Sequence, residues 1–306
     1  MSTAISLPPT MRVFERGWLS SNNVLFVDSD TTAIVDTGYM THAEQTLALV
    51  RHDLQGRPLD LVVNTHLHSD HCGGNAILQK AFGSRTLIPA AEADKVRDWD
   101  MEALSFDATG QQCERFGFDG TLSPGDALAL GGLRWQALAA PGHDPHSLIF
   151  YCPEAGILIS ADALWENGFG IIFPELDGES GFAEARATLD VIAGLDVKLV
   201  IPGHGAPFTD VQKALSNAYS RVDYLAADPA RNAQNAVKVM LKFLLLERQR
   251  IALAELPALL NAGSSFRSAN KYFLKKAPEE LAQWAAAQLV RAQAARIEGD
   301  TLLNHD

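Results

Sequence analysis

Several features are scarce in this chain of 306 residues, and each scarcity excludes a class of protein. The three cysteines, Cys72, Cys113 and Cys152, are too few and too scattered for a disulfide framework, so reduced thiols are expected. Lys and Arg total 25 against 37 Asp and Glu, and the formal net charge of -12 repels nucleic acid and anionic lipid. A nucleic-acid partner would therefore need a local basic patch.

Long apolar runs are also missing. No stretch approaches the roughly 20 apolar residues that a membrane span needs. The N-terminal segment has neither a basic start nor an apolar run before its prolines, so the sequence predicts a cytoplasmic protein with no membrane partner. What the chain does have is a balance of 47% hydrophobic and 20% charged residues, which is typical of a soluble globular protein with a sizeable core.

The pattern of short apolar runs and turns predicts two strand-rich halves followed by a helical tail. In the first half, β-rich runs alternate with turns up to about residue 40, and a helix is expected at 41–54. An almost wholly apolar strand at 59–64 then starts an alternation of strands and helices. The second half is predicted to hold five further strands, at 127–130, 133–138, 147–151, 156–160 and 198–201.

The pattern changes near residue 210, after which it is almost entirely helical. This change predicts a first domain at 1–210 and a mainly helical C-terminal appendage at 211–306. Alternating strands and helices in the first domain place the protein in the α/β class.

Four side chains of metal-ligand type follow the predicted buried strand within six positions: His66, His68, Asp70 and His71. Alternate residues of an extended segment point to the same side, so His66 and His68 can hold one ion. Asp70 and His71 lie where the chain turns into a helix and can face a second ion. Two glycines follow them and let the backbone pack closely at this turn.

Three more residues of ligand type lie at predicted strand ends. His143 follows Ala-Pro-Gly, Asp162 follows the strand at 156–160, and His204 follows Ile-Pro-Gly. Loops at the ends of buried strands are the usual place for functional residues in α/β proteins.

Together, the His-x-His-x-Asp-His motif at 66–71 and the later His143, Asp162 and His204 resemble the metallo-β-lactamase fold superfamily, in its dinuclear hydrolase branch with glyoxalase II and the lactonases. The resemblance covers about residues 1–210. It implies a four-layer αβ/βα sandwich with a metal site at the edge between two sheets. One residue departs from the family pattern, because Ala161 stands where a glycine usually precedes the bridging aspartate.

The resemblance also implies two divalent metal ions. Metal one would be held by His66, His68 and His143, metal two by Asp70, His71 and His204, and both by a bridging Asp162. Zinc is the first choice, with iron or manganese as alternatives, because mixed histidine and carboxylate ligation suits all three. Two such ions, about 3.5 to 4 Å apart, lower the pKa of a shared water, so that hydroxide is available near neutral pH. Asp70 is also the candidate proton shuttle to the leaving group.

Four residues outside the ligand set are candidates for supporting roles. Asp36, in Val-Asp-Thr-Gly, matches a family element and is expected to orient a ligand imidazole, with turn capping as the alternative. His146 either donates a proton or contacts substrate, or it caps the preceding Asp-Pro turn. Trp165 and Phe169 follow Asp162 closely and are predicted to form an apolar wall of the substrate pocket, with core packing as the alternative.

The tail resembles the winged helix found at the C-terminus of some superfamily members, because its helices are followed by a predicted hairpin around 298–300. Between 256 and 306, six Lys or Arg stand against five acidic residues, and a near-neutral module is a poor reader of DNA. The expected roles are packing, closure of the pocket or dimerisation, so a homodimer is one of the open outcomes.

The leading hypothesis is a metal-dependent hydrolase that uses a metal-bridging hydroxide on a small ester, thioester or lactone. Three alternatives stay open. A metal-dependent ribonuclease is the first, because some members with a winged-helix-like tail cleave RNA, although the acidic charge argues against it. A ligand-binding or regulatory protein with low turnover is the second. A β-lactamase is the third, although such enzymes usually need export and use a different ligand set for metal two.

Overall fold

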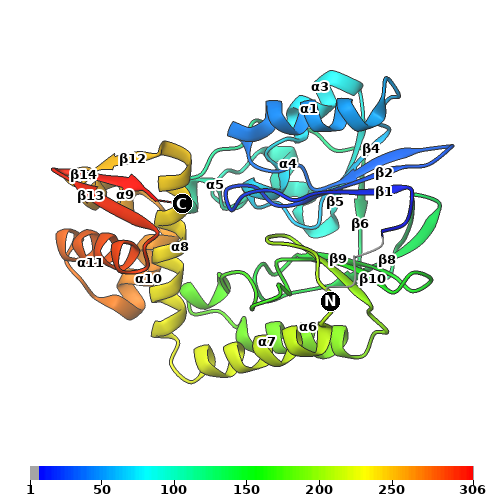
Figure 1. Ribbon diagram of the computed structural model, residues 1–306. Coiled ribbons are helices and arrows are strands. Elements are labelled where there is room, and N and C mark those ends of the chain that lie inside the picture. Colours follow the sequence, from blue (N-terminus) through cyan, green and yellow to red (C-terminus); the bar gives the residue numbers. More distant parts are fainter. Residues whose placement is uncertain (1–6, 306) are drawn as a thin grey trace.

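The computed structural model describes residues 7–305, and residues 1–6 of the N-terminal segment analysed above lie outside this range. Two sheets lie face to face (Figure 1). The first sheet has six strands in chain order: β1 (Met11–Phe14), β2 (Asn23–Val27), β3 (Thr32–Val35), β4 (Leu61–Val63), β5 (Arg85–Pro89) and β6 (Gly120–Leu122). The second sheet has five, in the order β11 (Leu199–Pro202), β10 (Ile157–Ala161), β9 (Leu148–Cys152), β8 (Leu133–Ala139) and β7 (Ala127–Leu130).

An apolar core between the sheets holds them together. Phe26 and Val35 of the first sheet and Trp135, Phe150 and Ile201 of the second are each at most 1% exposed. Burying a large apolar side chain contributes roughly 1.5 to 3 kcal/mol relative to leaving it in water. The central strand β4 pairs in parallel with β3 and β5, which explains why its residues form a continuous apolar run rather than an alternating one.

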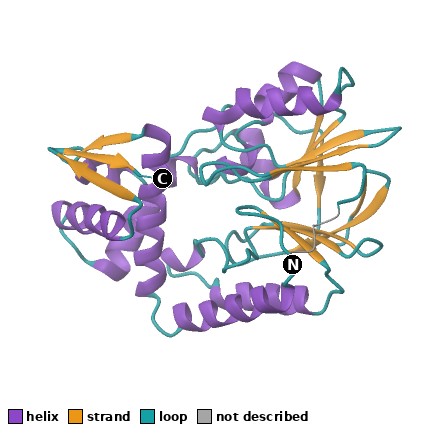
Figure 2. Cartoon of the chain, in the orientation of Figure 1, coloured by secondary structure: helices purple, strands orange, loops and turns teal. Residues whose placement is uncertain are grey.

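Helices cover the outer face of each sheet and complete a four-layer sandwich (Figure 2). On the first sheet these are α1 (Ala43–Leu54), preceded by the short η1 (Met40–His42), and α3 (Asn75–Phe82). On the second sheet they are α6 (Phe182–Ala193) and α7 (Val211–Ala226). Shorter helices lie in the connections: α2 (Ser69–Cys72), η2 (Ala90–Glu92), α4 (Ala93–Asp98), α5 (Phe106–Thr109) and η3 (Pro174–Leu176). The predicted αβ/βα architecture is therefore confirmed.

Residues 230–304 form a C-terminal module beside the sandwich (Figure 1). Its elements are α8 (Ala230–Arg248), β12 (Arg250–Ala252), α9 (Leu256–Ala262), α10 (Ser264–Ala269), η4 (Asn270–Leu274), α11 (Pro278–Arg291), β13 (Ala295–Glu298) and β14 (Thr301–Asn304). The predicted hairpin is present as β13 and β14, and β12 pairs with β14 as a third strand that we did not predict. This order of elements is the one expected for a winged-helix-like tail.

The module has a core of its own, which includes Leu244, Phe266 and Ala285. Helix α8 lies along the open edge of the two sheets (Figure 1). Helix α10 contacts both α8 and α5. Helix α7 follows residue 210 yet packs on α6, so the separate core begins only in α8. The division into domains 1–210 and 211–306 stays a prediction. No helix within residues 7–305 combines the length and the hydropathy needed to cross a bilayer.

Candidate metal centre

The candidate site lies on loops that follow the ends of β4, β8, β10 and β11. An irregular loop that bends at Thr65 leads from Val63 to His68, which has a φ of -63° and a ψ of 146° and directly precedes α2. Every residue of α2 is buried, including Asp70 and His71. Asp162 follows β10 and His204 follows β11, which are parallel neighbours, so both side chains emerge at the same sheet edge.

Three imidazole nitrogens converge in the first ligand group. Nε2 of His66 lies 3.1 Å from Nδ1 of His68, which lies 2.8 Å from Nε2 of His143. The outward nitrogens are occupied, because Nδ1 of His66 donates to Thr65 Oγ1 at 3.0 Å and Nδ1 of His143 donates to the Ile171 carbonyl at 2.5 Å. The inward nitrogens therefore present lone pairs to one another, an arrangement that suits a shared cation.

Asp70, His71 and His204 form the second group, and all three are buried. Oδ2 of Asp70 lies 3.0 Å from Nε2 of His204 and 3.8 Å from Nε2 of His71. Among the described residues, Nε2 of His71 is buried without a hydrogen-bond partner.

Asp162 lies between the two groups. Its Oδ1 is 3.3 Å from Nε2 of His71 and 3.9 Å from Nε2 of His204, whereas its Oδ2 is 3.4 Å from Nε2 of His143. Each carboxylate oxygen thus faces a different group. The structure brings all seven predicted ligand side chains together in the predicted grouping.

Backbone close to Asp162 is tightly constrained. A Cβ on Gly203 would lie 2.2 Å from Oδ1 of Asp162, so only glycine fits at this position. Ala161, where the family usually has glycine, has a φ of 45°, in the left-handed region that alanine enters at a cost of roughly 1 to 2 kcal/mol. The pairing of β10 with β11 shifts register at the same point. The departure from the family pattern therefore keeps the glycine-like backbone at the expense of some strain.

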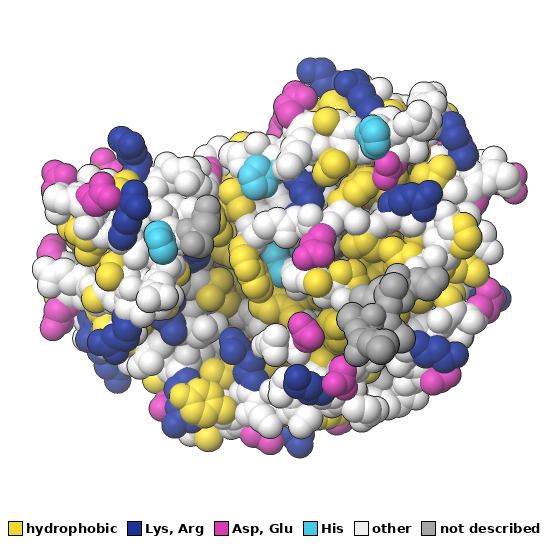
Figure 3. Space-filling view, in the orientation of Figure 1, with side chains coloured by type: hydrophobic (Ala, Val, Ile, Leu, Met, Phe, Trp, Pro, Cys, Tyr) yellow, Lys and Arg dark blue, Asp and Glu magenta, His cyan; other side chains and the backbone are white. Residues whose placement is uncertain are grey.

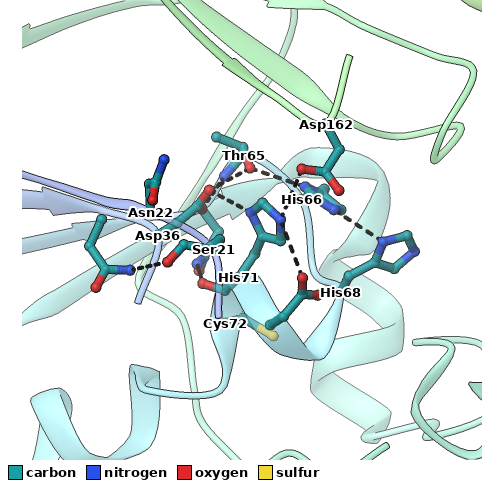
Figure 4. A network of polar contacts seen from close by, with 12 residues as sticks. Ser21, Asn22, Asp36, Thr65, His66, His68, His71, Cys72 and Asp162 are labelled. Carbon is teal, nitrogen blue, oxygen red and sulfur yellow. Dashed lines mark hydrogen bonds and ion pairs between the residues drawn. The ribbon is translucent and has the colours of Figure 1, made fainter. Parts of the chain in front are cut away.

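Asp36 lies behind the cluster and holds two of the ligands in place (Figure 4). Its carboxylate accepts hydrogen bonds from Nδ1 of His71 at 2.8 Å and from the backbone N–H and hydroxyl of Thr65 at 2.9 and 2.8 Å. The same Thr65 hydroxyl accepts from His66, so one buried carboxylate fixes the ring orientation of a residue from each group. Such partners raise the basicity of ligand imidazoles and set their tautomers.

We predict that Asp36→Asn lowers metal affinity about 10- to 100-fold. Asparagine tolerates the positive φ of 57° at this position, so the backbone should be retained, but its amide removes one acceptor. The buried donors left unpaired should also cost about 1 to 3 kcal/mol of stability. Competition with a chromophoric chelator measures the affinity. Asp60→Asn is the matched control, because Asp60 accepts the same kind of bonds from Thr32 at 2.8 and 3.0 Å but contacts no predicted ligand.

The electrostatics of the cluster fit a bound cation. Burial lowers the pKa of His143 to about 4 and that of His66 well below its usual value, so both rings are neutral at pH 7 and free to donate lone pairs. Burial also lowers the pKa of His71, but the carboxylates of Asp162, Asp36 and Asp70 outweigh it and raise that pKa well above the usual value. Buried carboxylates at this density require compensating positive charge, and bound divalent ions would supply it.

The sequence-family model of the metallo-beta-lactamase superfamily matches residues 16–204, which make up more than half of the chain. The chain belongs to the metallo-beta-lactamase superfamily. The match ends at His204, the last of the seven predicted ligands, and contains all of them.

Curated relatives are similar over part of their length. A hydroxyacylglutathione hydrolase from Brucella anthropi is 27% identical over 179 residues, which cover 58% of this chain and 56% of that protein. One from a Chelativorans species is 30% identical over 152 residues, which cover 49% and 50%. The chain thus spans about half the length of the curated relatives it matches.

Among solved structures, the metallo-beta-lactamase family protein TTHA1429 from Thermus thermophilus is similar with a TM-score of 0.59 at 20% identity, covering 98% of this chain and all of that one. TTHA1623 in a di-iron-bound form is similar with a TM-score of 0.55 at 24% identity, covering 68% and 98%. Both likenesses establish the superfamily fold.

A cavity of about 420 Å³ opens from the ligand cluster of this superfamily member toward the C-terminal module. Trp165, Phe169 and Phe173 line one wall, and Phe243 and Leu246 of α8 line the opposite one. Figure 3 shows the groove that separates the module from the body of the sandwich on this face. Trp165 and Phe169 thus line a cavity beside the ligand cluster, and Phe169, only 4% exposed, also belongs to a hydrophobic core, so their role in a substrate pocket stays a prediction.

His146 does not line this cavity. Its Nδ1 contacts the buried carboxylate of Glu92, which also pairs with Lys95 at 2.9 Å. The turn is held instead by Asp144, which accepts from the His146 backbone N–H at 2.8 Å. Among the described residues, no contact of the His146 side chain supports proton donation, substrate contact or turn capping, so its role stays a prediction.

Two aromatic residues that the sequence did not point to reach the site. Trp18, 55% exposed, stacks on the His204 ring with centroids 5.4 Å apart and planes at 9°. Phe243 approaches the same ring from α8, with centroids 6.3 Å apart. Trp18 lies in a turn without periodicity, and Phe243 reaches the site only because the module folds back onto the sandwich, so local patterns could not reveal either.

Proposed function

We propose that this protein is a dinuclear metal-dependent hydrolase of small esters, thioesters or lactones. The observation that carries the proposal is the presence of two ligand groups with Asp162 between them, at one end of a largely apolar cavity. The relatives named hydroxyacylglutathione hydrolase support hydrolysis at an acyl group.

In this proposal the seven predicted ligand residues hold the two metal ions. When bound, two divalent ions would supply Lewis acidity toward the acyl carbonyl and activate water near neutral pH. Asp70 takes the proton of the attacking water and returns it to the leaving group. Burial alone would raise the pKa of Asp70, but His71 and His204 outweigh it and lower the pKa, so the carboxylate is ionised and able to accept a proton.

The remaining residues position the ligands and shape the cavity. Asp36 and the Ile171 carbonyl hold ligand rings in the tautomer that leaves the inward nitrogen bare. The aromatic walls exclude water from the reacting acyl group and favour apolar acyl chains. We propose zinc as the resident metal, with iron or manganese tested beside it, since a structural relative was crystallised in a di-iron-bound form.

The proposal is tested by loading chelator-treated protein with zinc, iron or manganese and assaying a chromogenic ester, a thioester, a lactone, a chromogenic β-lactam and an RNA oligonucleotide. We expect turnover of at least one of the first three, lost with chelator and restored by metal. Preference for the RNA or the β-lactam would replace the proposal by the corresponding alternative. Metal binding without turnover of any of the five would favour a ligand-binding or regulatory protein.

We predict that Trp165→Ala raises KM most for substrates with long apolar acyl chains and least for acetyl substrates. The indole lies on the cavity wall, with its Nε1 3.4 Å from Oδ1 of Asp162 and its ring 5.4 Å from that of His204. It is only partly buried, so the loss of stability should stay below the about 3 to 5 kcal/mol typical of a core aromatic.

Phe169→Ala is the comparison, because Phe169 lines the same wall but is also packed in the core. It should show the full core cost in thermal or denaturant unfolding. A large drop in the Tm of Trp165→Ala together with an unchanged KM profile would remove Trp165 from the pocket.

A further inference from the structure

We propose that the cavity binds substrates whose end distant from the scissile bond carries an anion, a carboxylate or a phosphate, and that Arg221 and Lys238 recognise this group. The inference rests on the proposed function, because it places the acyl group at the metal ligands. It adds the chemical class of the substrate, and it concerns two residues of α7 and α8 rather than the metal ligands.

Arg221 lies on the cavity wall with neither a hydrogen-bond partner for its Nε nor an ion-paired carboxylate among the residues that the structure describes. Its Nε is buried and has no hydrogen-bond partner among residues 7–305, and its Cζ lies 5.4 Å from the centroid of the Phe169 ring. A Cβ on Gly168 would lie 3.0 Å from the Arg221 Cδ, so the glycine makes room for the side chain beside this loop. A partly buried guanidinium normally satisfies its fork of donors with a carboxylate or phosphate, which fits both groups in bidentate geometry.

Lys238 lies on the same cavity wall, one helical turn beyond Asn235. Within the part of the chain that the structure describes, neither Lys238 nor Arg221 forms an ion pair with a carboxylate. Burial lowers the pKa of Lys238, and the nearby charge of Arg221 lowers it further. Two like charges near each other on a partly buried wall repel, and an anionic ligand that contacts both relieves the repulsion.

A third basic residue on the cavity wall shows the contrast. Lys242 donates to Oδ1 of Asn304 at 2.6 Å and to the Ala294 carbonyl at 2.8 Å, so it serves to tie the module together. Within residues 7–305, neither Arg221 nor Lys238 donates a comparable hydrogen bond, and the Arg221 guanidinium lies over the Phe169 ring face. The chain has a formal net charge of -12, and this negative charge repels an anionic substrate. A local pair of cations would offset that repulsion inside the cavity.

The composition of the cavity defines the rest of the substrate. Phe169 forms the cavity wall between the ligand cluster and the cations. Its ring contacts Arg221. The backbone N–H of the next residue, Gly170, donates to the Asp162 carbonyl at 2.9 Å. The expected substrate therefore has an ester or thioester at one end, an apolar spacer and a terminal anion. A nucleic acid would need a basic track outside the cavity as well.

The activity test compares two esters of equal chain length, mono(4-nitrophenyl) adipate and 4-nitrophenyl hexanoate, on the metal-loaded protein. We expect wild type to prefer the adipate. Arg221→Met and Lys238→Met should each lower kcat/KM for the adipate about 10- to 100-fold, mainly through KM, as expected for a lost charge-assisted hydrogen bond. Hexanoate hydrolysis should stay within about twofold, and Arg221→Lys should retain part of the preference. Arg186→Met, which removes an exposed cation paired with Asp223 outside the cavity, is the control.

A binding test separates this inference from the proposed function. Quenching of tryptophan fluorescence would report binding of three uncleaved anilides, the hexanoyl compound and its analogues with a terminal carboxylate or phosphate. We expect at least one anionic anilide to bind roughly tenfold tighter, with the advantage lost in Arg221→Met and reduced at high salt. Such binding without turnover of any ester, thioester or lactone would overturn the hydrolase and support the anion site. Equal use of both esters by wild type, with Arg221→Met and Lys238→Met unchanged, would overturn the anion site and leave the hydrolase.

Discussion

Replacing Asp162 with alanine should abolish hydrolysis and lower the bound metal from two ions per chain to one or fewer. The two oxygens of Asp162 face different predicted ligand groups, at 3.3 Å from His71 and 3.4 Å from His143, so the substitution would remove the proposed shared ligand from both. The loss in kcat/KM should exceed the roughly 10- to 100-fold typical of a residue that only orients a ligand. Steady-state kinetics and elemental analysis of the same preparation measure both effects.

Asp98→Ala is the control for this substitution. Asp98 is an exposed aspartate of α4, and its loss should leave metal content and kcat/KM unchanged. Full activity of Asp162→Ala with two bound ions would show that the carboxylate between the groups has no part in the site.

Asp70→Asn should lower kcat about 10²- to 10⁴-fold while changing KM much less. The amide keeps the shape of the side chain and its position 3.0 Å from His204, but it cannot accept a proton from the attacking water. Measuring kcat, KM and metal content together separates the proton transfer from ligation. A variant with two ions and normal kcat would exclude Asp70 from the mechanism.

The residues of the candidate site were predictable because their signal is local. The spacing of His66 to His71 after an apolar strand, and the turn residues before His143 and His204, are visible without knowledge of the fold. Strands such as β1, β2 and β3 were predictable for the same reason, since short β-rich runs there are separated by turn residues.

What the sequence could not predict depends on contacts between distant segments. The wall formed by Phe243 and Leu246 exists only because α8 lies along the open edge of the sandwich. The strand β12 is three residues long, and it pairs with residues 301–303. A run this short shows no periodicity in the sequence, so only its pairing with β14 identifies it as a strand.

Single polar residues were the least predictable. From the sequence, Asp36 could either cap a turn or orient a ligand. Only the distance of 2.8 Å between its carboxylate and Nδ1 of His71 favours the orienting role. His146 lies three residues from His143, yet its ring turns to Glu92, which is 54 positions away in the chain. Similarly, Cys72 follows a predicted ligand but its Sγ lies 3.8 Å from that of Cys113, in a buried position. Sequence proximity to a ligand therefore does not define the site.

The most direct test of a dinuclear centre is the metal content of the purified protein, measured by elemental analysis after supplementation with zinc, iron or manganese and removal of unbound metal by gel filtration. The geometry of the two ligand groups and Asp162 predicts two ions per chain. Reproducibly less than one ion per chain, in protein that is folded, would contradict it.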